Sequence, residues 1–200
     1  MINKAVFLTL CAIVRFILFF YHPVFRVKGR ENVPKEGRVV ICGNHRGMLD
    51  PVWIIFALKL GRMPAVMSKK ELMKVPVLGA FLRYLRVIPV ERDGNDINAL
   101  KTGMKRLKEE HALLLFPEGT RVKSAGEVEA KGGAVLMAAR TDSPILPVYI
   151  STKRYPFSPI RCVIGECCKP QFAGSKPTEA EIRQATEDMM KRIYALGDRK

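Results

Sequence analysis

The segment VVICGNHRGMLDP, residues 39–51, contains the pattern that best predicts the fold class of this chain. Its first part, Val39 to Cys42, is a short run rich in β-branched residues that stops at Gly43, which predicts a buried strand. Its last part, Asp50-Pro51, has the pattern of a helix start, a capping residue followed by a proline at the first helical position. A polar loop joins the two. The order of strand, loop and helix predicts one repeating unit of an α/β sheet.

The same alternation continues toward the carboxyl end of the chain. Strands are predicted at residues 65–67, 87–90, 113–116, 145–150 and 162–164, and helices at 52–60, 71–85, 97–107, 134–139 and from Thr178 to about Leu196. Pro76 should kink the helix that contains it, and Pro89 indicates an edge strand or a bulge. Thr178 and Glu181 form a capping-box pattern. The chain is therefore predicted to be one α/β domain with a mostly parallel sheet flanked by helices.

Composition narrows the class of protein without choosing its function. The chain has 200 residues and a formal net charge of +15, so it should attract polyanions: nucleic acid, anionic lipid headgroups or a phosphate-bearing carrier. A nucleic-acid partner is not favoured, because there is one tryptophan and the basic residues are not interleaved with surface aromatics. The five cysteines are odd in number and contain no C-x-x-C pair, which argues against a disulfide framework or a zinc site and favours a reducing compartment.

The amino-terminal residues differ from the rest of the chain. Residues 5–21 are almost wholly apolar except for Arg15, and we treat residues 1–22 as a membrane-anchoring or interfacial helix and 23–200 as the α/β domain. The stretch is slightly short for a membrane span, so two arrangements remain open: a helix in the interface with Lys4 and Arg15 toward the headgroups, or a span with local thinning. The basic residues that follow predict that the domain stays on the cytosolic side in either case.

The polar loop after the first strand holds a candidate catalytic pair. His45 and Asp50 are five residues apart, which is too far around a continuous helix for good contact. In a loop that turns at Gly47, however, the carboxylate can return to the imidazole. A carboxylate on one ring nitrogen fixes the tautomer of histidine and leaves the other nitrogen free to accept a proton from an alcohol. The alternative is a capping Asp50 beside an ordinary loop histidine.

A second polar motif, FPEGTR, follows another predicted buried strand. Because ligand sites in α/β sheets gather at the carboxyl ends of strands, this loop should lie near His45. Gly119 permits a close backbone approach, Thr120 offers a hydroxyl, and the fork of Arg121 matches phosphate. Glu118 is expected either to hold Arg121 or to orient a substrate hydroxyl. The alternative is an ordinary ion pair in a loop.

Taken together, these motifs resemble the 1-acyl-glycerol-3-phosphate acyltransferase family. The His45-x-x-x-x-Asp50 pattern preceded by Asn44, and the hexapeptide that ends at Arg121, resemble the first and third signature blocks of that family. Further similar segments occur in the family's order: Ser68 to Leu72 with Pro76 and Gly79, Val87 to Arg92, Lys131 to Ala134, and Leu146 to Val148. The resemblance covers about residues 24–150. One difference is Gly47, where relatives often have serine.

The resemblance implies a glycerolipid acyltransferase-like fold and a specific reaction. A fatty acyl group would move from a thioester of coenzyme A or acyl carrier protein to the 2-hydroxyl of a lysophosphatidate, giving phosphatidic acid, with no metal and no cofactor. His45 would be the general base and Asp50 its orienting partner. The implied substrate phosphate-binding residues are Lys69, Arg92, Glu118, Gly119, Thr120, Arg121 and Lys131. The expected location is the cytosolic face of the cell membrane, as a peripheral or singly anchored protein.

Two alternatives stay open at the level of sequence. The first is an acyltransferase of the same fold that acts on another lysolipid or an amino-lipid. The second is a non-catalytic membrane-binding module, which would use the basic charge and the apolar amino terminus. An acceptor screen separates the first alternative from the lysophosphatidate reaction, and substitution of His45 separates the second.

Overall fold

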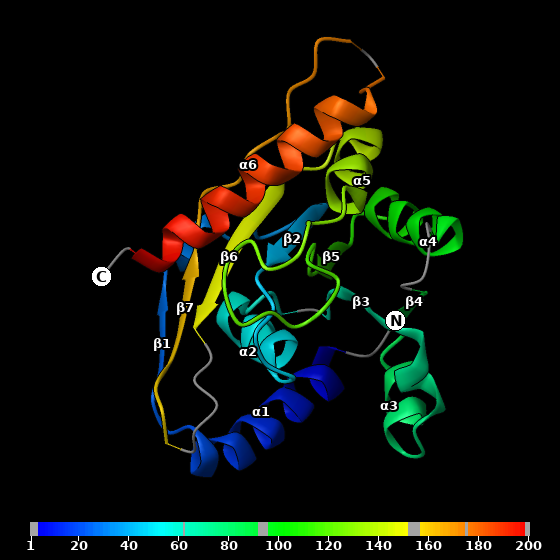
Figure 1. Cartoon of the computed structure of the whole chain (residues 1–200). Helices are drawn as coiled ribbons and strands as arrows, with labels where there is room; N and C mark the ends of the chain where they lie inside the picture. The colour runs from blue at the N-terminus through cyan, green and yellow to red at the C-terminus, as the bar shows by residue number, and fades with distance from the viewer. Residues whose placement is uncertain (1–3, 62, 92–95, 152–156, 175, 199–200) are drawn as a thin grey trace.

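The computed structural model describes residues 4–61, 63–91, 96–151, 157–174 and 176–198, with the side chain of Lys4 excepted, and its architecture is a single sheet flanked by helices (Figure 1). Seven strands form the sheet in the order β1-β7-β6-β2-β5-β3-β4. Their bounds are β1 Phe25–Lys28, β2 Val39–Gly43, β3 Ala65–Lys69, β4 Ile88–Val90, β5 Ala112–Leu115, β6 Ile145–Ser151 and β7 Ile160–Ile164. All neighbouring pairs are parallel except β6 and β7. This confirms the predicted α/β class with a mostly parallel sheet.

Helices cover both faces of the sheet, so it has two hydrophobic cores. The helical elements are α1 Lys4–Tyr21, η1 Arg30–Asn32, α2 Asp50–Leu58, η2 Lys70–Lys74, α3 Leu78–Tyr84, α4 Ile97–Lys108, α5 Gly133–Thr141 and α6 Glu179–Asp198. Helix α2 packs its buried residues on one face of the sheet, while α4, α5 and α6 pack on the other (Figure 1). Strand β2 serves both cores, because Val39 and Ile41 face the first and Val40 and Cys42 the second. A strand buried on both faces reads as a continuous apolar run, as residues 39–42 do.

Two expectations about the elements were wrong in detail. The helix predicted at residues 71–85 is interrupted, because Val75 is extended, with φ −71° and ψ 124°, and Val77 has a positive φ. Pro76 explains the break, since the residue before a proline is pushed out of the helical region. Strand β1 was not predicted at all. It pairs with β7 at the sheet edge, and its alternating exposure reflects a strand that is only half covered. The edge position predicted from Pro89 is confirmed by β4.

Helix α1 lies against the domain through one stripe of side chains. Phe7 is buried and Leu18 packs on the α2 side of the sheet. The guanidinium of Arg15 lies over the rings of Phe25 and Trp53, 5.7 and 5.5 Å from their centroids. Arg15 therefore faces the protein through cation–π contacts, and the expectation that it reaches toward headgroups is wrong. Within the part of the chain that is described, no helix combines the length and the apolar character required to cross a membrane.

Candidate active site

The two polar loops leave the sheet at the same edge, as predicted. Strands β2 and β5 are parallel neighbours, with Cys42 opposite Leu115. The first loop, residues 44–50, follows β2 and is called the dyad loop below. The second, residues 116–131, follows β5 and is called the cation loop. The arrangement matches the rule that sites in α/β sheets form beyond the carboxyl ends of the strands.

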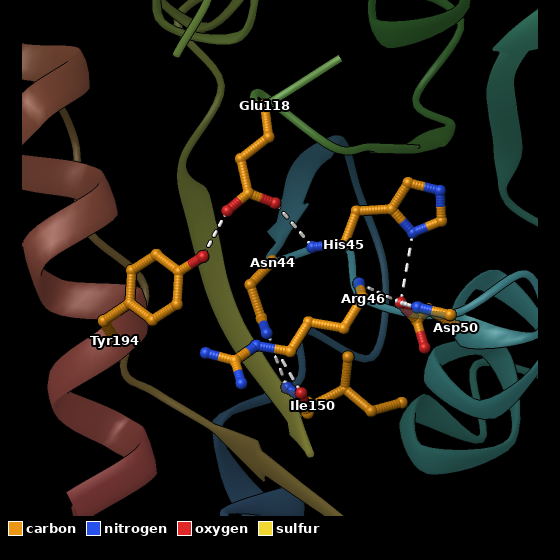
Figure 2. Close-up of polar contacts among 8 residues, drawn as sticks. Asn44, His45, Arg46, Asp50, Glu118, Ile150 and Tyr194 are labelled. Atoms are coloured by element: carbon orange, nitrogen blue, oxygen red, sulfur yellow. Dashed lines mark hydrogen bonds and ion pairs between the residues drawn. The ribbon is translucent and has the colours of Figure 1, made fainter. Parts of the chain in front are cut away.

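The dyad loop brings His45 and Asp50 together. Nδ1 of His45 lies 3.1 Å from Oδ2 of Asp50. The same carboxylate oxygen accepts hydrogen bonds from the backbone N–H groups of Arg46 and Gly47, both at 2.6 Å. Asp50 is completely buried, whereas the His45 side chain is 13% exposed. The other ring nitrogen of His45, Nε2, points away from Asp50 (Figure 2), so it is in position to meet a substrate.

The start of the dyad loop is fixed to the sheet by Asn44. Its side-chain amide donates to the carbonyl of Ile150 at 3.0 Å, and its Oδ1 accepts from the Ile150 N–H at 2.8 Å (Figure 2). Asn44 is fully buried, and both of these bonds reach across to strand β6. In the sequence, Asn44 was noticed only as the residue before the histidine. Its contacts give it a structural role, which is to hold the point where the chain leaves β2.

The cation loop holds His45 on three sides. Glu118 Oε2 accepts from the His45 N–H at 2.6 Å, and the Val122 N–H donates to the His45 carbonyl at 2.8 Å. The ring of Phe116 stacks on the imidazole, with centroids 4.3 Å apart and planes 22° apart. Backbone and ring of His45 are therefore both positioned by residues that follow β5. Such support keeps a catalytic side chain in one orientation before substrate arrives.

Glu118 is buried between two partners rather than turned toward a substrate. Its Oε1 accepts from the hydroxyl of Tyr194, on α6, while Oε2 holds the backbone of His45 (Figure 2). Burial raises the pKa of Glu118 above its ordinary value, and the hydrogen bonds from Tyr194 and His45 oppose this rise. Burial also raises the pKa of Tyr194, and its hydrogen bond to Glu118 adds to the effect. The contacts of Glu118 indicate a positioning role, which differs from the phosphate-binding role expected for it.

Three of the remaining predicted phosphate-binding residues, Gly119, Thr120 and Arg121, lie together on the cation loop. Thr120 and Arg121 are exposed on the cation loop between Glu118 and Val122, whose contacts bring this stretch beside His45. Gly119 has φ +66°, which favours glycine, and its N–H donates to the Phe116 carbonyl at 3.0 Å. The side chain of Lys131 lies beside Gly119, whereas Lys69 ends β3 and its Nζ lies 3.8 Å from Oε2 of Glu71. Arg92 is outside the described residues. Their role in phosphate binding stays a prediction.

Two further residues near the site are Tyr194, whose contact with Glu118 was not predicted, and Cys42, which lies close to His45 in sequence. Tyr194 was missed because it lies 76 residues from Glu118 in sequence and belongs to a helix whose pattern marks only its buried face. Arg46, 5.9 Å from the Tyr194 ring centroid, adds a second link to α6. Cys42, three residues before His45, is fully buried in β2, and burial raises its pKa well above the ordinary range. A thiol in that state is a poor nucleophile.

Comparisons with known proteins identify the family to which the chain is similar. The family model described as Acyltransferase matches residues 24–151. A 1-acyl-sn-glycerol-3-phosphate acyltransferase of Bacillus subtilis (strain 168) is 28% identical over 182 residues, covering 87% of this chain and 88% of that protein. A protein with the same name from Borreliella burgdorferi is 33% identical over 124 residues, 61% of this chain and 49% of that protein. This chain thus matches about half the length of the Borreliella relative.

A solved structure is similar over nearly the whole chain. It is the crystal structure of the 1-acyl-sn-glycerophosphate (LPA) acyltransferase, PlsC, from Thermotoga maritima. The TM-score is 0.69 and the sequence identity 26%, with 92% of this chain and 75% of that chain covered. The similarity therefore extends beyond residues 24–151 to the elements that flank them.

Proposed function

The chain belongs to the acyltransferase family, and from this premise we propose that it transfers a fatty acyl group from a thioester to the 2-hydroxyl of 1-acyl-glycerol-3-phosphate. The observation that carries the proposal is the pairing of His45 Nδ1 with Asp50 Oδ2 at the carboxyl end of β2, beside the cation loop. Relatives whose names state this acceptor match most of the chain, and the family model covers residues 24–151, which include both loops. The product would be phosphatidic acid, a precursor in phospholipid synthesis.

In the proposed mechanism His45 is the general base. Asp50 accepts a hydrogen bond from Nδ1–H of His45 and keeps the ring proton on that nitrogen, so the lone pair on Nε2 is available to take the proton of the substrate hydroxyl. The hydroxyl oxygen attacks the thioester carbonyl as its proton moves to Nε2. The tetrahedral intermediate then expels the thiolate, which receives a proton from the imidazolium. The buried carboxylate of Asp50 stabilises the imidazolium between the two proton transfers.

In this mechanism basic side chains hold the acceptor's phosphate. Arg121 is the first candidate, because the bonds of Glu118 and Val122 place its stretch of the cation loop against His45. A planar guanidinium can bind phosphate through two parallel hydrogen bonds. Thr120, Gly119, Lys131, Lys69 and Arg92 complete the proposed set. The acyl donor is a thioester of coenzyme A or of acyl carrier protein.

We also propose that α1 lies in the membrane interface on the cytosolic side. Its outward side chains are large and apolar, including Phe16, Ile17 and Phe20. Arg15 is turned inward over Trp53, so its charge is withdrawn from that outward face. A helix of this kind buries its apolar face at the boundary between headgroups and acyl chains. This position would bring the dyad loop near a substrate that resides in the lipid.

The test is an acyl-transfer assay of the purified chain with lysophosphatidate, other lysolipids and both thioester donors. His45→Ala should lower kcat by about 10²–10⁴, the usual contribution of a general base. His111→Ala is the matched control, because His111 precedes β5 at the opposite end of that strand from Phe116. Equal activity of the two variants would exclude the proposed base. Transfer to another lysolipid in preference to lysophosphatidate would change the acceptor but not the mechanism.

A further inference from the structure

We propose that residues 70–86, which contain η2 and α3 and are called the η2–α3 segment, form a second lipid-contacting surface that inserts an apolar tip into an anionic membrane. The inference deepens the proposed function and rests on it in one respect, namely that the acceptor is a lipid. Its main evidence comes from residues 70–86, which lie outside the dyad loop. Four observations carry it: clustered exposure of apolar side chains, a strained turn, an excess of cations and the position of the segment.

The η2–α3 segment exposes an unusual number of large apolar side chains. Val77 is 85% exposed, more than any other large apolar residue described. The exposed set within this segment is Leu72, Val75, Val77, Leu78, Phe81 and Tyr84. Single exposed apolar residues are common on protein surfaces, but a cluster within one short segment marks a contact surface.

The turn that presents Val77 is strained. Val77 has φ 61° and ψ −58°, and the Leu78 N–H donates to the Pro76 carbonyl at 2.6 Å. These angles and this bond define a classic γ-turn, a rare conformation that is costly for a β-branched residue. Gly79 keeps the turn closed, since a Cβ there would lie 2.2 Å from the Met73 carbonyl oxygen. The strain holds an apolar side chain outward, and burying that side chain among lipids would offset its cost.

Charge identifies the kind of surface that the segment fits. Its cations are Lys70, Lys74, Arg83 and Arg86, and its acidic residue is Glu71. Lys70 pairs with Glu91, and Arg83 donates to the Met73 carbonyl, so Lys74 and Arg86 are the cations to test. Apolar side chains rimmed by cations complement a layer of anionic headgroups over acyl chains. An acidic protein would complement the cations but would leave the apolar tip unexplained.

The position of the segment agrees with a lipid surface. Figure 1 places α3 and α1 at the same end of the molecule, the lower end in that view. Helix α1 also exposes large apolar side chains, and Met48 of the dyad loop is exposed as well. A membrane that contacts both α1 and α3 would therefore lie close to the edge of the sheet where His45 is found.

The experiment is cosedimentation of the full chain with vesicles made of phosphatidylcholine and phosphatidylglycerol in equal amounts. Val77→Asp should weaken vesicle binding at least about tenfold, because it removes an inserted side chain and adds a charge to the contact. Ile97→Asp is the matched control: Ile97 is also apolar and 59% exposed, but it begins α4. The control should bind like the unchanged chain. Acyl transfer to a short-chain, monodisperse lysophosphatidate should be unchanged in Val77→Asp.

A second variant tests the charge component. Lys74→Glu combined with Arg86→Glu should remove the preference for vesicles that contain phosphatidylglycerol over pure phosphatidylcholine vesicles. Val77→Asp and Ile97→Asp binding vesicles equally would overturn the proposal. A change in the oligomeric state of Val77→Asp, measured by light scattering, would also overturn it, because a second copy of the chain would then be the occupant of this surface. The same holds if Val77→Asp loses binding to an acidic carrier protein while its vesicle binding stays intact. If vesicle binding depends on Val77 but no acyl transfer is detected, the surface stands and the proposed reaction fails.

Discussion

The dyad loop and the cation loop lie side by side but are held in different ways. In the dyad loop, one buried carboxylate oxygen of Asp50 binds the imidazole and two backbone amides within five residues. In the cation loop, Glu118 and Val122 bind His45, whereas Thr120 and Arg121 between them are exposed. The group that needs one orientation is thus supported by several hydrogen bonds, whereas the groups proposed to meet a charged headgroup are exposed to solvent. This division is expected where a base must be preorganised.

The largest expected effect comes from disturbing the dyad loop from within. Asp50→Asn keeps the size of the side chain, and its oxygen can still accept from the Arg46 and Gly47 amides. The same oxygen position faces Nδ1 of His45, so the amide NH2 would take the buried position of Oδ1, and the imidazolium would lose the negative charge that stabilises it. We expect kcat to fall about 10³-fold, with KM for lysophosphatidate little changed. A variant that retains kcat within a few fold would show that the carboxylate is not required.

Substitution of Arg121, an exposed residue of the cation loop, should change KM rather than kcat. Arg121→Ala removes a proposed charge-assisted bond to phosphate, which is worth about 1.5–3 kcal/mol. We therefore expect KM for lysophosphatidate to rise roughly 10- to 100-fold and KM for the thioester to stay the same. Arg140→Ala, at the end of α5, removes the same charge from an exposed site and serves as the control. Similar increases for both substrates would move Arg121 out of the phosphate site.

Glu118 joins the two loops, so its removal should weaken the support of His45 in the dyad loop. Glu118→Ala leaves the His45 N–H and the Tyr194 hydroxyl without their acceptor. We expect the free energy of unfolding to fall by about 1–3 kcal/mol and kcat to fall about tenfold, because the backbone of His45 loses a fixed point. Urea denaturation and steady-state kinetics measure the two effects. An increase in KM for lysophosphatidate with kcat unchanged would instead support a direct contact between Glu118 and substrate.

The pH dependence of stability provides a separate test of this carboxyl group. Burial raises the pKa of Glu118 in the folded state above its ordinary value of 4.5. The folded state then binds the proton more tightly, so the cost of burying the charge is present above the raised pKa and disappears as the pH falls to the unfolded value. Glu118→Gln does not titrate and can bond both partners. The unchanged chain should therefore gain stability relative to Glu118→Gln as the pH falls through this window.

The sequence was sufficient for those parts of the fold and site whose causes are local. The strand before His45 was predicted from four consecutive residues, and the contact of His45 with Asp50 from a loop that turns within five. Local signals failed where a distant partner decides the outcome. Strand β1 forms because β7 offers an edge, and Glu118 turns inward because Tyr194 meets it. Arg15 faces Trp53 for the same reason, since an aromatic ring brought near by folding stabilises its charge better than the apolar helix alone indicates.

The smallest expected effect comes from the Tyr194 hydroxyl, which supports the site through its hydrogen bond to Glu118. Tyr194→Phe keeps the ring under Arg46 but removes the hydroxyl that donates to Glu118. A hydrogen bond to a carboxylate contributes about 1.5 kcal/mol at the low end of the usual range, so the free energy of unfolding should fall by about that amount and kcat by a few fold. KM should not change, because the hydroxyl touches no proposed substrate group. Tyr149→Phe, whose ring centroid lies 6.5 Å from that of Tyr194, removes a hydroxyl from the same interface as a control. If both variants lowered kcat equally, the cause would be a change in the packing of α6. If only Tyr194→Phe lowered kcat, the hydrogen bond from Tyr194 to Glu118 would be one of the contacts that keep His45 in position.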